Sequence, residues 1–219
     1  MTKVSDRLLR LSESATLAMA RMSRELKQQG HDVIALSLGE PDFDTPDFIK
    51  ESAKKAIDNN FSHYTPVPGL MELREAICTK LKRDNHLEYS PENIIVSTGA
   101  KQSIANLCLS LLNPEDEVIL PAPYWVSYFE LVKLGEAKPI VVESSIDNDF
   151  KISPQQLRKS ITAKTKMLIF STPCNPSGTV YTQKELEDIA DVLKDFPNIY
   201  VVCDEIYELI NFGVTHFSL

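Results

Sequence analysis

The run Lys-Met-Leu-Ile-Phe at residues 166–170 is followed directly by Ser171, Thr172 and Pro173. After its first residue the run is apolar throughout, which is typical of a strand that is covered on both faces of a sheet. The chain contains four further short apolar runs, at residues 93–97, 117–120, 139–142 and 199–203. Together these runs predict five buried strands.

Segments with helical character lie between most of these runs, at residues 100–112, 125–134, 154–160 and 183–194. Thr182 and Glu185 form the capping-box pattern at the start of the last of them. Buried strands that alternate with helices predict an α/β fold. We expect three layers, with helices on both sides of a mostly parallel sheet.

Three helices are predicted before the first of these strands. Residues 14–29 place apolar side chains on one face, and Gly30 is suited to the C-terminal cap. A second helix is predicted over residues 46–59, with Thr45 as its N-cap and Pro46 as its first residue. A third is predicted from about Leu70 to Lys82.

The composition is that of an ordinary globular protein, with 219 residues, 43% hydrophobic and 25% charged. The net charge of −8 argues against nucleic acid or an anionic membrane surface as a partner. No apolar stretch reaches the roughly 18 residues of a membrane span, and the N-terminus lacks the apolar core of a secretory signal, so we expect a cytoplasmic protein. The four cysteines and four histidines are scattered without metal-ligand spacing, and we expect neither disulfides nor a metal site.

Ligands of parallel α/β sheets lie beyond the carboxyl ends of the strands. At one predicted strand end, Ser97-Thr-Gly-Ala-Lys101 leads into a helix, and its free backbone amides suit a phosphate group. A plain capped turn explains this stretch equally well. At another, Asn175 lies between Pro173 and Pro176, which favours a rigid amide donor or an ordinary turn.

Two further strand ends carry candidate binding residues. Trp125, the only tryptophan, follows the strand at residues 117–120 and suits either a ligand contact or an apolar interface. Asp204 ends the strand at residues 199–203, where a carboxylate needs a donor partner or caps a helix.

Five stretches, in this order, resemble one family: the class I aminotransferases of fold type I, which use pyridoxal phosphate. The stretches are Gly39-Glu-Pro-Asp-Phe43, the segment from Tyr64 to Arg74, Pro123-Tyr-Trp125, Pro173-x-Asn175-Pro-x-Gly178 and Asp204-Glu-Ile-Tyr207. The resemblance runs from about Ser14 to Leu219 and is strongest to short bacterial aspartate aminotransferases. It implies an N-terminal arm and small-domain segment over residues 1–45, and an incomplete pyridoxal phosphate-binding large domain over residues 46–219.

The resemblance also implies roles for single residues. Asp204 would hydrogen-bond the pyridine nitrogen of the cofactor, while Tyr207 and Asn175 would donate to its phenolic oxygen. Trp125 would stack on the ring. The phosphate would be held by the backbone amides of Gly99, Ala100 and Lys101.

Two residues near the N-terminus complete the implied site. Tyr64 would reach the cofactor phosphate of a neighbouring subunit, which implies a homodimer with shared active sites. The backbone of Gly39, with Asn175 and Trp125, would border the α-carboxylate of the substrate.

The implied reaction moves an amino group from an amino acid, with aspartate or glutamate expected, to a 2-oxo acid. In the family a lysine that forms a Schiff base follows a serine after a further strand, and none of the lysines up to Lys194 stands in such a context. We therefore expect an N-terminal part of such an enzyme that is inactive as it stands, and we assign no catalytic residue.

Other functions remain open. Within the same fold type, the alternatives are an aromatic, alanine or prephenate aminotransferase or a β-lyase. From a different class, a non-catalytic module that binds pyridoxal phosphate or phosphate is the alternative. A nucleotide-binding protein is disfavoured because neither a G-x-G-x-x-G nor a Walker loop occurs.

Overall fold

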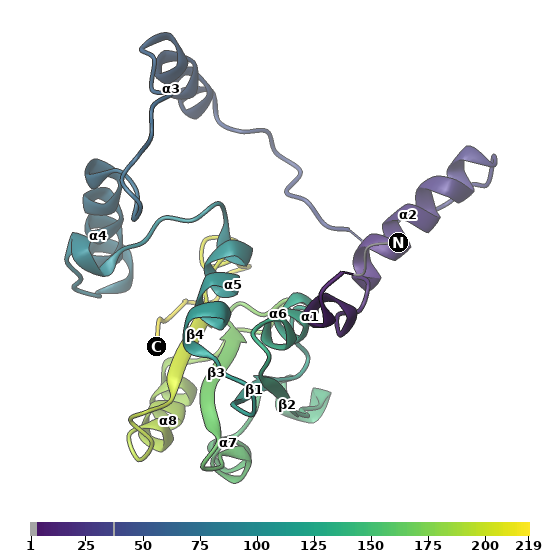
Figure 1. Ribbon diagram of the computed structural model, residues 1–219, viewed down its shortest axis with the longest axis vertical. Coiled ribbons are helices and arrows are strands. Elements are labelled where there is room, and N and C mark those ends of the chain that lie inside the picture. The colour runs from purple at the N-terminus through teal and green to yellow at the C-terminus, as the bar shows by residue number, and fades with distance from the viewer. Residues whose placement is uncertain (1–3, 37) are drawn as a thin grey trace. The chain divides into compact units, whose positions relative to one another are not determined.

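The computed structural model describes residues 4–36 and 38–219, and the chain divides into two compact units (Figure 1). The sheet unit consists of the described residues through Ser12, Leu81–Leu87 and Ser97–Leu219. The helical unit consists of Glu13–Lys80 and Glu88–Val96. The domain boundary predicted at residues 45 and 46 stays a prediction.

Four short strands form the sheet of the sheet unit. They are β1 (Glu117–Pro121), β2 (Lys138–Val142), β3 (Thr165–Ser171) and β4 (Tyr200–Asp204). The order is β2-β1-β3-β4, and all neighbouring strands are parallel. The predicted α/β fold with a parallel sheet is therefore confirmed, and four of the predicted strands lie within a residue or two of their observed bounds.

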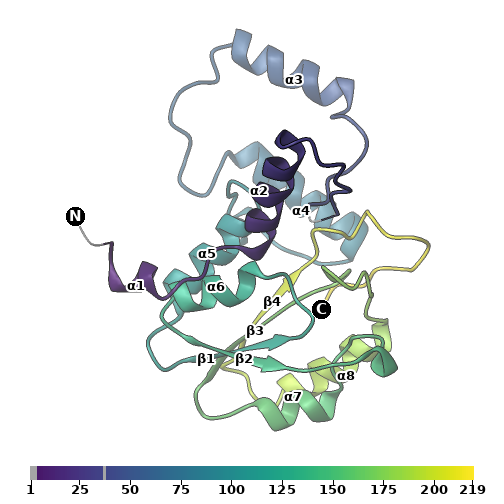
Figure 2. The ribbon, with the colours of Figure 1, turned by 90° about the vertical axis from the view of Figure 1, so that its right-hand side faces the viewer.

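Helices cover both faces of this sheet (Figure 2). On one face lie α5 (Ala100–Leu111) and α6 (Ser127–Leu134), and on the other lie α7 (Pro154–Ser160) and α8 (Gln183–Leu193). Strand β3 serves both layers, because successive side chains of a strand point to opposite faces. Met167 and Ile169 pack with α5 and α6, whereas Leu168 and Phe170 pack with α7 and α8. The three-layer architecture is thus built from two separate apolar clusters.

The remaining elements are short or belong to the helical unit. The sheet unit adds α1 (Asp6–Leu9) and the 3-10 turn η2 (Ile146–Asn148). The helical unit contains α2 (Ala15–Gln28), α3 (Asp47–Asp58), most of α4 (Met71–Asn85) and the 3-10 turn η1 (Pro91–Asn93). Among the described helices, none is both long and apolar enough to cross a membrane.

The strand predicted at residues 93–97 is wrong. Asn93 ends η1, and the residues that follow it form no strand. Val96 donates its amide to the carbonyl of Pro68 at 3.0 Å, within the helical unit. Its backbone therefore bonds a turn rather than a neighbouring strand. An apolar run alone does not show that a strand has a partner.

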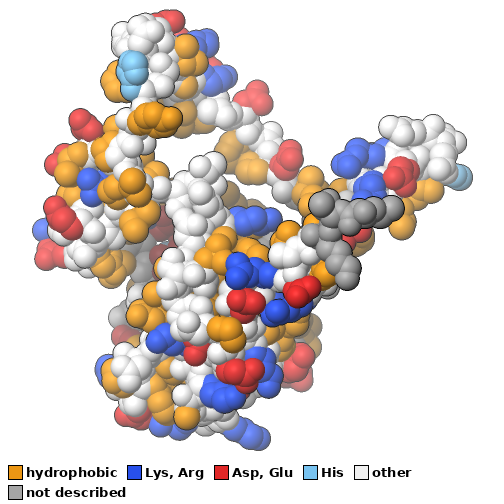
Figure 3. Space-filling model, viewed as in Figure 1, with side chains coloured by type: hydrophobic (Ala, Val, Ile, Leu, Met, Phe, Trp, Pro, Cys, Tyr) orange, Lys and Arg blue, Asp and Glu red, His pale blue; other side chains and the backbone are white. Residues whose placement is uncertain are grey.

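The helical unit buries few side chains. Figure 3 shows hydrophobic side chains at the surface of α3 and α4. Arg74 is the exception: its guanidinium donates to the carbonyl of Pro91 at 2.9 Å. Helix α3 begins one residue later than predicted, with Pro46 rather than Thr45 at the N-cap. Proline has no hydroxyl, so this helix has no side-chain cap.

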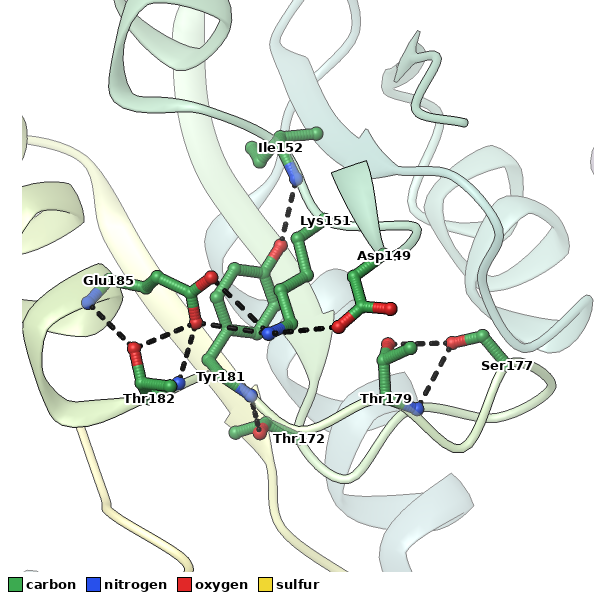
Figure 4. A network of polar contacts seen from close by, with 9 residues as sticks. All are labelled: Asp149, Lys151, Ile152, Thr172, Ser177, Thr179, Tyr181, Thr182 and Glu185. Atoms are coloured by element: carbon green, nitrogen blue, oxygen red, sulfur yellow. Dashed lines mark hydrogen bonds and ion pairs between the residues drawn. The ribbon is translucent and has the colours of Figure 1, made fainter. Parts of the chain in front are cut away.

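A polar network fixes the connection between β3 and α8 (Figure 4). The predicted capping box is confirmed, with Glu185 accepting hydrogen bonds from the amide and hydroxyl of Thr182. The carboxylate of Glu185 also pairs with Lys151 at 3.1 Å. Tyr181 lies behind this pair and accepts a hydrogen bond from the amide of Ile152. Burial raises the pKa of Tyr181 to about 12, so this phenol stays protonated.

Candidate functional site

Parallel pairing brings the ends of β3 and β4 together. Ser171 is the register partner of Asp204, and the amide of the next residue, Thr172, donates to the carbonyl of Asp204 at 3.1 Å. Thr172 is fully buried, and its hydroxyl accepts from the amide of Tyr181. Thr172 and Tyr181, which Figure 4 labels, therefore join the two ends of the loop that carries Asn175, and Thr172 ties this loop to the end of β4.

The carboxylate of Asp204 is held by two donors. The hydroxyl of Tyr128 donates to its Oδ2 at 2.7 Å, and the amide of Ile206 donates to its Oδ1 at 3.2 Å. The sequence left a donor partner and a helix N-cap as alternatives for Asp204. The described residues after β4 form a turn and no helix, and the second hydrogen bond joins Asp204 to that turn. It remains only partly buried.

Tyr128 is the residue that the sequence analysis missed. It lies on α6, is 1% exposed and packs in the cluster with α5. Burial raises the pKa of Tyr128, and the hydrogen bond and negative charge of Asp204 raise it further. The phenol therefore stays protonated and donates to the carboxylate. One signal was available: in the helix predicted over residues 125–134, Tyr128 follows Trp125 by three residues, a spacing that would place both side chains on one face.

Trp125 links this pair to the start of α5. Its ring stands perpendicular to that of Tyr128, with 5.5 Å between the ring centroids. On the same ring, the Nζ of Lys101 lies 4.9 Å from the centroid. Asp204, Tyr128, Trp125 and Lys101 are therefore joined by successive contacts within the sheet unit.

Gly99 precedes α5 in a conformation that favours glycine. Its φ of 86° lies in the left-handed region, and it occupies the N-cap position. Ala100 and Lys101 are the first two helical residues, so their amides have no carbonyl acceptor one turn earlier in the helix. The amide of Gly99 itself donates to the carbonyl of Ser97 at 2.8 Å. The start of α5 thus offers two free amides and the positive end of a helix to an anion.

The loop that carries Asn175 is tied across its base. The amide of Cys174 donates to the carbonyl of Thr179 at 2.9 Å, and the amide of Gly178 donates to the carbonyl of Cys174 at 2.7 Å. Gly178 has a φ of 72°, which allows the tight return of the chain. Asn175 and Tyr207, which lies three residues after Asp204, are both partly buried.

The other two predicted site residues belong to the helical unit. Gly39 and Tyr64 are exposed there, and the Tyr64 side chain is exposed entirely. The cluster described above is built by residues of the sheet unit alone. The assignments of Gly39 and Tyr64 stay predictions.

The donor set fits a planar aromatic ligand with a phosphate group. The amides at the start of α5 suit the phosphate, Trp125 offers a ring face, and the carboxylate of Asp204 suits a protonated ring nitrogen. Pyridoxal phosphate has all three features.

Comparisons with known proteins show the family to which the chain belongs. The sequence pattern of the family described as aminotransferase class I and II matches residues 31–218. A probable aspartate/prephenate aminotransferase of Rickettsia bellii is 50% identical, over 100% of this chain and 55% of that protein. Aspartate aminotransferase of Bacillus subtilis is 47% identical, over 96% of this chain and 53% of that protein.

The fold comparison gives the same result. The structure of aspartate aminotransferase from Thermus thermophilus with maleate has a TM-score of 0.95 and 41% identity, and the match covers 100% of this chain and 57% of that one. The chain thus spans about half the length of the curated relatives that it matches.

Proposed function

The chain belongs to the class I and II aminotransferases, and on that premise we propose that the protein transfers an amino group from aspartate or glutamate to a 2-oxo acid with pyridoxal phosphate as cofactor. One observation carries the proposal within this chain. The carboxylate of Asp204 stands at the carboxyl end of β4, fixed by Tyr128, and is joined through Trp125 to the anion-binding start of α5.

Each residue of the cluster then has a physical task toward the cofactor. The free amides of Ala100 and Lys101 hold the phosphate, and Trp125 covers one face of the ring. The amide of Gly99, which was expected to join them, donates to the carbonyl of Ser97 in this structure. Asp204 accepts a hydrogen bond from the ring nitrogen, and its negative charge favours the protonated form of that nitrogen. When bound, pyridoxal phosphate supplies an electron-accepting ring that stabilises negative charge at the substrate Cα.

Two further side chains act on the phenolic oxygen of the cofactor. Asn175 and Tyr207 donate hydrogen bonds to it and so favour its ionised form. Tyr128 contacts none of these atoms in this proposal. Its task is to hold Asp204, because a carboxylate with one oxygen fixed by a buried donor keeps its orientation toward the ring nitrogen.

An acidic substrate suits the charge of the cluster. Lys101 places a cation on the face of Trp125, and Trp125 and Asn175 with the backbone of Gly39 border the α-carboxylate in this proposal. The solved Thermus protein was crystallised with maleate, a dicarboxylate. Prephenate is the second candidate substrate, because several relatives carry it in their names.

The assembly and the compartment are also proposals. A homodimer with shared sites is supported by the complete exposure of Tyr64, the residue expected to reach a partner's cofactor. A cytoplasmic location is supported by four cysteines that are all free thiols. We also propose the division into a segment of residues 1–45 and a cofactor-binding domain of residues 46–219.

The test is an assay of the complete protein with aspartate or glutamate and a 2-oxo acid, together with a pyridoxal phosphate titration. We expect formation of the matching oxo acid, and loss of activity when the cofactor is removed. The 219-residue chain by itself is expected to give no turnover. A complete protein that binds the cofactor without transferring amino groups from any amino acid would support the alternative, a non-catalytic binding module.

A further inference from the structure

A second group of titratable side chains lies just beyond β4. Glu205 follows Asp204 directly and Glu208 comes three residues after Glu205, while His216 returns to them from further along the chain. One carboxylate oxygen of each glutamate and a ring nitrogen of the histidine all lie within 4.8 Å of one another. All three residues belong to the sheet unit.

The histidine supplies an independent reason to look for a ligand. Its side chain is 9% exposed, and both ring nitrogens are buried without a hydrogen-bond partner among the described residues. Nitrogens in such a place are normally satisfied, because a buried polar atom without a partner is costly. The ring is nevertheless directed into the cluster, since its Nε2 lies 3.2 Å from Oε2 of Glu205.

That contact has the geometry of two ligands of one ion. In a tetrahedral site with bonds of about 2.0–2.1 Å, neighbouring ligand atoms lie roughly 3.3 Å apart without hydrogen-bonding each other. The nitrogen of His216 and the oxygen of Glu205 are close at this distance but do not form a hydrogen bond.

Both carboxylates also accept a hydrogen bond from a neutral side chain. The hydroxyl of Ser218 donates to Oε2 of Glu205 at 2.7 Å, and the amide of Asn85 donates to Oε2 of Glu208 at 2.9 Å. Asn85 also donates to the hydroxyl of Ser218 at 2.9 Å, which connects the two donors. Metal-binding side chains are commonly fixed by an outer layer of this kind.

We propose that Glu205, Glu208 and His216 bind a divalent cation of the first transition row, with Zn²⁺ as the best match. One imidazole nitrogen with two carboxylate oxygens suits Zn²⁺, whereas Mg²⁺ and Ca²⁺ prefer oxygen ligands throughout. The ion would fasten the segment after β4, which contains Tyr207, to residues 216–218. The sequence did not indicate this site, because its ligands lack the spacing of known zinc motifs.

The test uses the 219-residue chain after treatment with EDTA and needs no aminotransferase activity. Zn²⁺ is titrated by calorimetry, and thermal unfolding is followed in parallel. We expect one ion per chain and a rise in Tm of roughly 5 °C at an ion concentration of about 100 times Kd. His216→Gln and Glu208→Gln should each weaken binding at least about tenfold. His63→Gln and Glu187→Gln, which alter exposed residues, are the matched controls.

Three results would overturn the proposal. They are the absence of binding at millimolar Zn²⁺, equal affinity in the wild type and in Glu208→Gln, and tighter binding of Mg²⁺ or Ca²⁺ than of Zn²⁺. Equal affinity would place the ion elsewhere, for example at one of the free thiols. A parallel titration with Mn²⁺, which thiolates bind poorly, should show the same loss in both variants. Circular dichroism checks that each variant is folded. If His216→Gln does not fold, the comparison of wild type with Glu208→Gln decides the test.

Discussion

The sheet unit and the helical unit use hydrophobic residues in opposite ways. In the sheet unit such residues fill two clusters, one on each face of the sheet, and Leu168 at its centre is 1% exposed. In the helical unit Leu36 is 91% exposed, and Arg74 is the one buried side chain among the described residues. Only the sheet unit therefore builds a core of its own. A site placed on it has a rigid support, which explains why the cofactor contacts proposed here concentrate there.

The largest expected effect on kcat distinguishes a proposed site residue of the sheet unit, Asp204, from one of the helical unit, Tyr64. In the complete protein, Asp204→Ala should lower kcat by about a thousandfold or more, about 4 kcal/mol, because in the proposed site Asp204 is the carboxylate that keeps the ring nitrogen of the cofactor protonated. Tyr64→Phe removes a single hydrogen-bonding group and should cost about tenfold. Steady-state kinetics with saturating cofactor measure both. Equal losses of kcat in the two variants would contradict the expectation that the sheet unit contributes more to catalysis than the helical unit.

Substitutions of hydrophobic residues should also lower the stability more in the sheet unit than in the helical unit. Leu168→Ala leaves a cavity between β3 and the helices α7 and α8, and should lower the free energy of unfolding by about 2–5 kcal/mol. Leu36→Ala, the same change at an exposed position, should stay within about 0.5 kcal/mol. Urea unfolding of the 219-residue chain compares them. A loss above about 2 kcal/mol for Leu36→Ala would show that the helical unit has a core after all.

A smaller effect tests how the sheet unit supports its site. Tyr128→Phe removes the donor to Asp204, a charged acceptor, and should cost about 1.5–3 kcal/mol shared between stability and catalysis. We expect kcat to fall roughly tenfold or more while the variant remains folded. Tyr200→Phe, on the exposed side of β4, is the control and should leave kcat unchanged. Unaltered kinetics in Tyr128→Phe would mean that Asp204 keeps its orientation without help.

The smallest effect concerns pH. Burial alone would raise the pKa of Glu185, but hydrogen bonds from Thr182 and Lys151 outweigh it and lower this pKa below its usual value. Glu185 therefore stabilises the folded chain above its unfolded pKa, near 4.5, and this contribution is lost as the pH falls through its lower folded pKa. Glu185→Gln should reduce stability at pH 7 by less than about 1 kcal/mol, and the difference from wild type should shrink as the pH falls below the usual carboxyl pKa near 4.5.

The matched change in the helical unit is Glu51→Gln, which breaks an exposed pair with Lys54. We expect almost no effect at either pH, because exposed pairs contribute little. Thermal unfolding at pH 7 and pH 3 measures both variants. A larger effect for Glu51→Gln than for Glu185→Gln would reverse the expected order.

Local patterns were enough to predict most of the sheet unit. The apolar run at residues 166–170 and the capping box at Thr182 correspond to β3 and to the start of α8. The run at residues 93–97 has the same local character but forms no strand. One segment alone does not show whether a second strand is available to pair with it. Tyr128 was missed for a similar reason, since only the folded chain brings α6 to the end of β4.

The pairing of β4 with β3 also limits which insertions and deletions the chain can tolerate. Because Cys203 and Asp204 point to opposite sides of the sheet, inserting or deleting one codon within residues 200–204 would exchange their places. The thiol would then take the place of the carboxylate beside Tyr128, and the carboxylate would enter the apolar layer beneath α8. Insertions and deletions in this part of the protein should therefore be tolerated only outside β4. An alignment of natural variants would test this, because gaps should be absent from residues 200–204.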